Sequence, residues 1–204
     1  RNYYKILRTI HGKQFREDYL FGSILKILTA EPNSIHNAIA RLIHILKISK
    51  RKVSLITQNL DNLHEKSNKN LEVIHIHGDL TQGKCSVCNR KYNYKQILLN
   101  YQKNPDQHDL FLCSTYNTQC EGIISPDMIE YGEKVLEFPK CAKIAAQSDL
   151  MIVMGTSLRV SPTNHLVNIV KKNNGNIILL TRSSTSKDDL ADFHIRGDLL
   201  SILP

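Results

Sequence analysis

The chain has 204 residues, 41% of them hydrophobic, and a formal net charge of +8. This length can bury a sizeable core and predicts one domain with a small insert, whereas no apolar run reaches the ~20 residues of a membrane span and the first residues lack a signal-peptide core. We therefore expect an intracellular protein, nuclear or cytoplasmic with a mitochondrial location left open, that makes no contact with membranes.

The positive charge is spread along the chain rather than gathered in one region. The lysines are accompanied by many asparagines and isoleucines, which is typical of a composition bias rather than of a nucleic-acid surface. The densest basic run, residues 47–52, has the composition of a nuclear signal or a phosphate-contacting loop, but a solvated connection between a helix and a strand explains it more simply. No direct nucleic-acid binding is expected.

The first regular element predicted along the chain is an amphipathic helix. Pro32, Asn33 and Ser34 supply its start signal. Apolar residues then recur at helical spacing and form one stripe that faces a core. These residues are Ile35, Ala38, Ile39, Leu42, Ile43 and Leu46. A short buried strand over residues 53–56 is predicted to follow.

Two later apolar runs, residues 150–154 and 177–180, also predict strands. Continuous rather than alternating runs indicate parallel strands that are covered on both faces. A helix is predicted between them over residues 162–172, and Gly175 marks its end. Its inward-facing residues are Leu166, Val167 and Val170. This order of elements predicts an α/β fold.

Each predicted strand is followed directly by small or polar residues. They are Thr57-Gln58-Asn59, Gly155-Thr156-Ser157 and Thr181-Arg182-Ser183. In open parallel sheets, ligands bind in the crevice beyond the carboxyl ends of the strands. We therefore predict that the three segments line a ligand crevice, although helix N-capping by Asn59 or Asp61 is the simpler alternative for the first of them.

Four of the five cysteines form two spaced pairs, Cys85 with Cys88 and Cys113 with Cys120. Two such pairs can hold Zn²⁺ tetrahedrally, and four sulfur ligands make a closed, structural site. The second pair is more widely spaced and is the weaker signal. Disulfide bonds are the alternative, which an intracellular location disfavours. Cys141 is left over and is predicted to be a small buried residue in a helix.

The four paired cysteines lie within the predicted insert, residues 79–125, and residues 1–78 and 126–204 form the main domain. The insert is rich in Asn, Gln and Tyr. This composition predicts that the insert cannot support a core without its zinc ion.

Two histidines, His75 and His77, precede the insert and alternate along an extended segment, which places them on one face. His77 is followed by Gly78 at the predicted end of the strand. A histidine at such a position suits general-base work, because its ordinary pKa near 6.5 leaves it neutral at working pH. A single histidine is more often structural, but here the histidines stand between the polar segment and the insert.

Together these segments resemble the sirtuins, the NAD-dependent protein-lysine deacylases. Residues 57–64, TQNLDNLH, are similar to the TQNIDxLH signature of that family, and residues 76–78, IHG, to the segment with its catalytic histidine. Residues 125–133, SPDMIEYGE, are similar to the stretch that pairs with the acyl-lysine peptide, and residues 155–162, GTSLRVSP, to the loop that holds NAD. The cysteines match the four zinc ligands. The resemblance implies a Rossmann-like parallel sheet with a small zinc-binding insert.

The resemblance also implies an activity and the residues that carry it. The acyl group of a modified lysine is transferred to ADP-ribose, nicotinamide is released, and His77 takes a proton from a ribose hydroxyl. Asn59 and Asp61 join His77 as catalytic residues. The residues implied to bind NAD are Gln58, Asn59, Asp61, Gly155, Thr156, Ser157, Thr181, Arg182, Ser183 and Leu199. Ile129 and Tyr131 are implied to line the tunnel for the substrate lysine, and acyl-lysine proteins, with histones among the possibilities, are the expected partners.

The chain departs from the family pattern at its start. The glycine-rich GAGxS segment with which sirtuins begin has no counterpart in residues 1–31, where the glycines are Gly12 and Gly22. A glycine-rich turn holds the pyrophosphate in nucleotide sites of this kind. The 204-residue chain alone is therefore expected to bind NAD weakly and to turn over poorly. Thr181 also replaces the asparagine that commonly binds the adenosine ribose.

Two alternatives to the deacylase remain open from the sequence. ADP-ribosyl transfer would use the same cofactor site and differ in the acceptor. A catalytically weak or inactive sirtuin-like module would bind an acylated peptide, or a protein partner through the zinc insert.

Overall fold

The computed structural model describes residues 16–117 and 119–203, and predictions that fall on residues 1–15, including the one on Gly12, lie outside this part of the chain. Backbone contacts divide the described residues into two compact units. Unit 1 contains residues 16–31, Asn59–Asn62 and Gly78–Tyr131, and unit 2 contains Pro32–Gln58, Leu63–His77 and residues 132–203. Unit 1 thus holds the predicted insert together with further stretches, and the predicted domain division stays a prediction.

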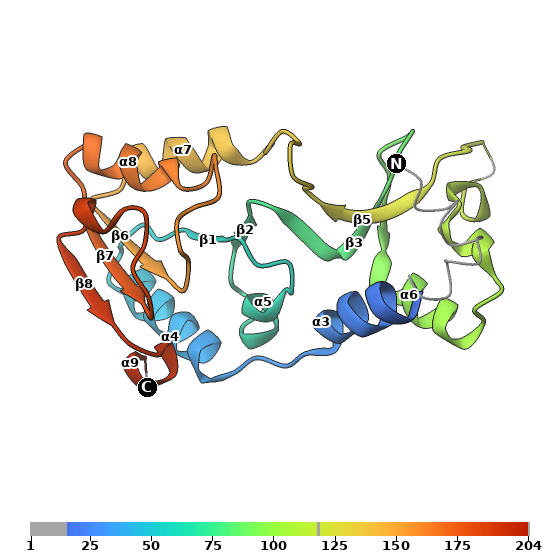
Figure 1. Ribbon diagram of the computed structural model, residues 1–204, viewed down its shortest axis with the longest axis horizontal. Coiled ribbons are helices and arrows are strands. Elements are labelled where there is room, and N and C mark those ends of the chain that lie inside the picture. Colours follow the sequence, from blue (N-terminus) through green and yellow to red (C-terminus); the bar gives the residue numbers. More distant parts are fainter. Residues whose placement is uncertain (1–15, 118, 204) are drawn as a thin grey trace. The chain divides into compact units, whose positions relative to one another are not determined.

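Unit 2 is built on two parallel sheets (Figure 1). β1, Leu55–Thr57, pairs with β2, Val73–His75. β7, Asn176–Thr181, lies between β6, Leu150–Met154, and β8, Phe193–Arg196. The helices of this unit are α4 Ser34–Ile48, α5 Leu63–Ser67, α7 Phe138–Ala146, α8 His165–Lys172, the 3₁₀ turn η4 Asp188–Leu190 and α9 Leu199–Ile202. The predicted parallel α/β fold is confirmed.

The amphipathic helix predicted near residue 35 is α4. Asn33 is its N-cap: the Asn33 side-chain oxygen accepts hydrogen bonds from the N–H groups of Ile35 and His36, at 3.1 and 3.3 Å. The His36 ring accepts one in return from the Asn33 N–H, at 3.2 Å. These bonds satisfy N–H groups that have no partner inside the helix. Ile39, Ala40 and Ile43 are buried against residues of β1 and β2, so α4 holds these strands in place.

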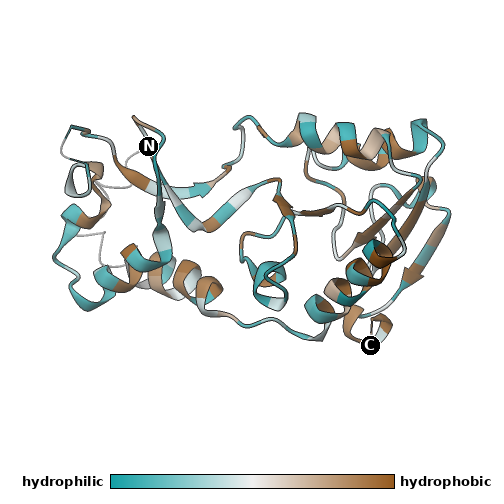
Figure 2. Cartoon of the chain, turned by 180° about the vertical axis from the view of Figure 1, so that it is seen from behind, coloured by the Kyte–Doolittle hydropathy of each residue, from teal (hydrophilic) through white to brown (hydrophobic). Residues whose placement is uncertain are grey.

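The predicted burial of β6 on both faces is wrong for its first residues. Leu150 and Ile152 are 45% and 36% exposed, and Phe193 and Ile195 of β8 are 67% and 49% exposed. The register pairs Ile178 with Phe193 and with Ile152, which places these exposed side chains on one face of the sheet. Figure 2 shows the hydrophobic colouring of these strands. The opposite face packs against α8, whose predicted inward residues are buried.

Unit 1 contains an antiparallel sheet in the order β4, β3, β5. The strands are β3 Gly78–Cys85, β4 Lys91–Asn93 and β5 Ile124–Met128. Its helical segments are η1 Arg16–Leu25, α3 Lys26–Thr29, α6 Tyr94–Lys103, η2 His108–Phe111 and η3 Cys113–Thr115. None of the helices in either unit, as far as the structure describes the chain, is long and apolar enough to cross a bilayer.

The insert contributes residues to a hydrophobic core in unit 1, and the dependence of this core on zinc stays a prediction. Tyr94, Tyr101 and Phe111 are fully buried in unit 1, and the rings of Tyr101 and Phe111 meet edge to face with centroids 4.9 Å apart. Leu20 and Leu28, from η1 and α3, belong to the same core. The aromatic residues that made the insert look polar supply its apolar surface, and residues ahead of it in the sequence complete the core.

Candidate functional site

Unit 2 has a cavity at the carboxyl ends of β6 and β7, with a volume of about 510 Å³. This volume lies within the ~300–1,000 Å³ that is usual for small-molecule sites. It is lined by Ile35, Gly155, Thr156, Ser157, Thr181, Arg182, Ser183, Ser184, Gly197, Asp198, Leu199 and Leu200. The polar segments that follow the second and third predicted strands therefore lie together, with Leu199. Their assignment to NAD stays a prediction.

The segment after β6 is held by hydrogen bonds to Leu180 and to Gln58. Gly155 has φ of +66°, a conformation in which side chains are strained, and its N–H donates to the Leu180 carbonyl at 3.0 Å. The Thr156 hydroxyl accepts from the Leu158 N–H at 3.2 Å and from the Gln58 side-chain amide at 3.4 Å. Gln58 is thus tied to the cavity through Thr156, although it does not line it.

Thr181 lines the cavity and is also part of a polar chain. The Thr181 hydroxyl donates to the Ser183 carbonyl at 2.8 Å and lies 2.9 Å from Nε2 of His194. Nδ1 of His194 is 3.6 Å from the Asp188 carboxylate. Hydrogen bonds from the side chain and backbone of Thr185 hold the pKa of Asp188 below its ordinary value. These contacts shape the turn at residues 181–183. Arg182 pairs with Asp198 at the rim.

His77 also lies in unit 2, just beyond the end of β2. Its Nε2 is 2.9 Å from the hydroxyl of Thr163. Burial lowers the pKa of His77 below the ordinary 6.5, and a hydrogen bond to the backbone of Gln58 opposes this only in part. The ring is therefore neutral at pH 7, as a general base requires.

His75 is engaged differently from His77. Its Nε2 lies 2.6 Å from a carboxylate oxygen of Glu65 on α5. Burial raises the pKa of Glu65, but the hydrogen bond from His75, a backbone hydrogen bond and the charges of His75 and His64 together outweigh it, so the pKa of Glu65 lies below its ordinary value. His75 is thus a structural partner of α5, and β2 ends at this residue rather than continuing to His77.

The remaining predicted site residues, which come from residues 57–64 and 125–133, belong to unit 1. Asn59 is exposed, and Asp61 and Ile129 are half-buried. Tyr131 is 97% exposed. A side chain so open to solvent lines no tunnel within unit 1, and the substrate roles of Ile129 and Tyr131 stay predictions.

The four predicted zinc ligands come together in unit 1. The sulfur atoms of Cys85, Cys88, Cys113 and Cys120 all lie within 4.8 Å of one another. Cys85 and Cys120 sulfurs are 3.6 Å apart, and Cys88 and Cys113 sulfurs are 3.7 Å apart. Zn–S bonds of about 2.3 Å in a tetrahedron place sulfurs about 3.8 Å apart. The cluster therefore fits a zinc ion, and all five cysteines are free of disulfide bonds.

Two other residues contact the cysteine cluster. The Tyr92 hydroxyl lies 2.9 Å from the Cys113 sulfur, where it can donate to a thiolate. Gly122 lies against the other side, because a Cβ at this position would stand 2.2 Å from the Cys85 sulfur. A side chain at residue 122 would occupy the space of a ligand.

Gly122→Ala is expected to weaken zinc retention, because the added methyl group must push the Cys85 sulfur out of the tetrahedron. Zinc content after dialysis against a competing chelator measures this effect. Gly197→Ala is the control, since its methyl group would meet only the Ile202 side chain, at 3.3 Å or more. Equal zinc retention in the two variants would contradict the prediction.

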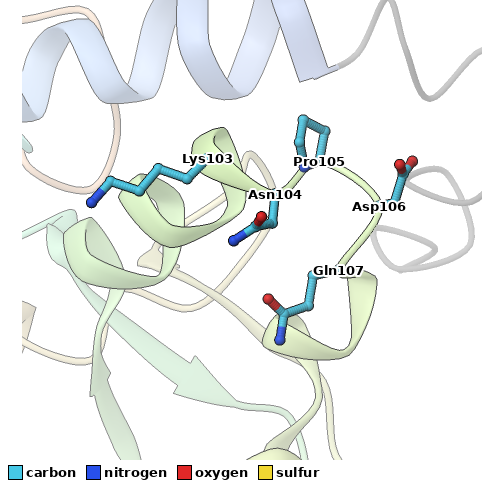
Figure 3. A pocket seen from close by; sticks show the side chains of 5 residues that line it. All are labelled: Lys103, Asn104, Pro105, Asp106 and Gln107. Carbon is cyan, nitrogen blue, oxygen red and sulfur yellow. The ribbon is translucent and has the colours of Figure 1, made fainter.

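A second hollow lies at the end of α6, and it carries no candidate site. Its lining residues, Lys103, Asn104, Pro105, Asp106 and Gln107, are consecutive and exposed. The side chains of Lys103 and Asp106 point away from each other (Figure 3). No second element of the fold contributes to it.

Sequence reasoning missed Thr163, Glu65, Tyr92, Gly122 and His194. Gly122 could have been predicted, because a glycine close to a metal-binding cysteine indicates that there is no room for a side chain there. The others carry no local signal, because their partners are distant in sequence; His77 and Thr163 are 86 positions apart.

Known proteins resemble this chain in sequence and in fold. A sequence profile described as the Sir2 family matches residues 8–162. An NAD-dependent protein deacetylase of Sulfolobus acidocaldarius is 33% identical over 178 residues, which cover 87% of this chain and 66% of that protein. An NAD-dependent protein deacylase of Pyrococcus abyssi is 33% identical, covering 89% of this chain and 69% of that protein. The chain therefore spans about two thirds of the length of these curated relatives.

Solved structures agree with these matches. A structure described as Sir2 with a p53 peptide and NAD⁺ aligns with a TM-score of 0.76 at 25% identity, covering 95% of this chain and 74% of that chain. A structure of Sir2 bound to an acetylated peptide aligns with a TM-score of 0.77 at 24% identity, covering 95% and 75%, and supports the fold alone. Because the family profile covers well over half of the sequence, the chain belongs to the Sir2 family.

Proposed function

We propose that this chain is an NAD-dependent protein-lysine deacylase, which transfers the acyl group from lysine to ADP-ribose and releases nicotinamide. The observation that carries the proposal is the cavity of unit 2, where Gly155, Thr156 and Ser157 meet Thr181 to Ser183 at the carboxyl ends of parallel strands. A crevice at this place in an open parallel sheet is where nucleotides bind. The names of the relatives support the same activity.

The chain's own residues have distinct tasks in this proposal. The cavity binds the nucleotide, with the Gly155 turn allowing the backbone to approach it closely. Asn59 and Asp61 bind the nicotinamide ribose and carboxamide, as the family resemblance implies. His77 takes a proton on Nε2 from a ribose hydroxyl, a task that its lowered pKa suits.

Acyl-lysine proteins are the proposed substrates, and histones are one candidate among them. Support comes from the solved Sir2 structure described as bound to a p53 peptide and NAD⁺. We also propose an intracellular location, nuclear or cytoplasmic, because a cluster of four zinc-binding thiolates persists best in a reducing compartment.

The test is nicotinamide release from NAD in the presence of an acetyl-lysine peptide, with the unacetylated peptide as control. We expect release that depends on the acetyl group, accompanied by an equal amount of deacetylated peptide. NAD is supplied in large excess so that its binding does not limit the rate. ADP-ribose attached to an acceptor protein, or peptide binding without nicotinamide release, would contradict the proposal and favour one of the two alternatives.

A further inference from the structure

Thr163 contacts the imidazole of His77 at a nitrogen that the proposed reaction uses. The Thr163 hydroxyl lies 2.9 Å from Nε2 of His77, and the backbone of Gln58 is also hydrogen-bonded to the ring. All three residues belong to unit 2. With Nε2 facing Thr163, the Gln58 contact falls to Nδ1. Both ring nitrogens therefore have a partner.

These two partners define the state of the ring. The Gln58 contact raises the pKa of His77, as expected when a carbonyl accepts from a ring N–H. With the proton on Nδ1, the neutral ring has its lone pair on Nε2, and the Thr163 hydroxyl donates to it. A hydroxyl can also accept from Nε2–H after the ring gains a proton. Thr163 can thus bond His77 in both protonation states, without rotation of the ring.

Thr163 is itself held firmly. It is 5% exposed, and its carbonyl accepts from the Leu166 N–H at 3.1 Å, at the start of α8. A β-branched side chain has few rotamers. The preceding segment is anchored as well, since the Leu158 carbonyl accepts from the Ser186 hydroxyl at 2.5 Å. The hydroxyl is therefore a fixed reference point for the ring of His77.

We propose that Thr163 is a positioning residue for His77: its hydroxyl fixes the ring plane and keeps Nε2 as the nitrogen that accepts the substrate proton. This inference rests on the proposed function, in which His77 is the base. The ribose hydroxyl then takes over the Nε2 lone pair from the Thr163 hydroxyl, and its proton passes to Nε2 as the ribose oxygen attacks the acyl carbon. The Thr163 oxygen, which keeps its own proton, can then accept from the new Nε2–H.

The test compares Thr163→Val, which keeps the shape and removes the hydroxyl, with Thr163→Ser, which keeps the hydroxyl. We expect kcat to fall about 3- to 10-fold in Thr163→Val, the effect of one lost hydrogen bond, while the KM for NAD changes less than about twofold. Thr163→Ser should retain kcat. If Thr163 served folding alone, kcat would fall in both variants or in neither. If Thr163→Val does not fold, Thr163→Ala takes its place.

A second readout does not depend on activity. The pKa of His77 is measured by NMR of the histidine rings, with its signal assigned as the one of nine that His77→Gln removes. Because a hydrogen bond to the charged ring is stronger than one to the neutral ring, losing the hydroxyl disfavours protonation. The pKa should fall further in Thr163→Val, by about half a unit to one unit, and stay unchanged in Thr163→Ser.

The two readouts separate the possible failures. A lowered pKa of His77 in Thr163→Val without any deacylation by the unsubstituted protein would support the contact and overturn the proposed function. Full deacylation and an unchanged pKa in Thr163→Val would overturn the role of Thr163 and leave the proposed function intact.

Discussion

Replacing His77 by alanine is expected to lower the rate of acyl transfer by roughly 10²–10⁴-fold, the usual contribution of a positioned base. Replacing His75 should cost much less. The two histidines are close in sequence but have different partners, because Nε2 of His75 is 2.6 Å from the Glu65 carboxylate whereas Nε2 of His77 is 2.9 Å from the Thr163 hydroxyl. Rates of peptide deacetylation under single-turnover conditions measure both effects.

The matched control for His77→Ala is His75→Ala itself. It removes the partner of a half-buried carboxylate, so its thermal stability is measured alongside its rate. Equal losses of rate in the two variants, with both proteins folded, would show that the assignment of the base to His77 is wrong.

Removal of the zinc ion is expected to unfold the part of unit 1 around the cysteine cluster. Binding of structural zinc contributes about 10–16 kcal/mol in zinc-finger peptides, which is as large as the ~5–15 kcal/mol stability of a whole domain. The aromatic core of Tyr94, Tyr101 and Phe111 lies in the same cluster of buried residues as three of the ligands. One zinc ion per chain is expected, and loss of the ion should abolish the cooperative unfolding transition of unit 1.

Two fully buried cysteines provide the comparison for this prediction. Cys113 belongs to the cluster and Cys141 does not, yet both are 0% exposed. Cys113→Ala should lose zinc and the folded unit, whereas Cys141→Ala should keep its zinc and lose only the packing of one sulfur. Zinc analysis and circular dichroism measure both. Zinc-free protein with an unchanged melting curve would contradict a structural role for the metal.

The periodic part of the fold could be predicted from the sequence. The stripe that predicted α4 buries Ile39 and Ile43, and the apolar run 150–154 is β6 with the same bounds. Such elements are set by local patterns of burial. The strand predicted from residue 53 begins instead at Leu55, because parallel pairing with β2 decides its ends, and pairing depends on residues elsewhere in the chain.

The candidate site could be predicted in composition but not in geometry. The spacing of Cys85 and Cys88 predicts a metal-binding turn from a few consecutive residues. The hydrogen bond between His77 and Thr163 could not be predicted in this way, since either residue alone is compatible with many environments. The core of unit 1 was missed for the same reason: Leu20 lies far from Tyr94 in the sequence and packs in the same cluster.

The exposed apolar face of the sheet in unit 2 affects how the protein behaves in concentrated solution. Leu150, Ile152, Phe193 and Ile195 present apolar surface to the solvent, and such surface on two copies attracts. The net charge of +8 opposes this attraction. Salt weakens the repulsion, because charges are screened beyond about 8 Å at physiological ionic strength, while the apolar attraction persists. Ionic strength is therefore the condition that governs how much of this protein stays dispersed.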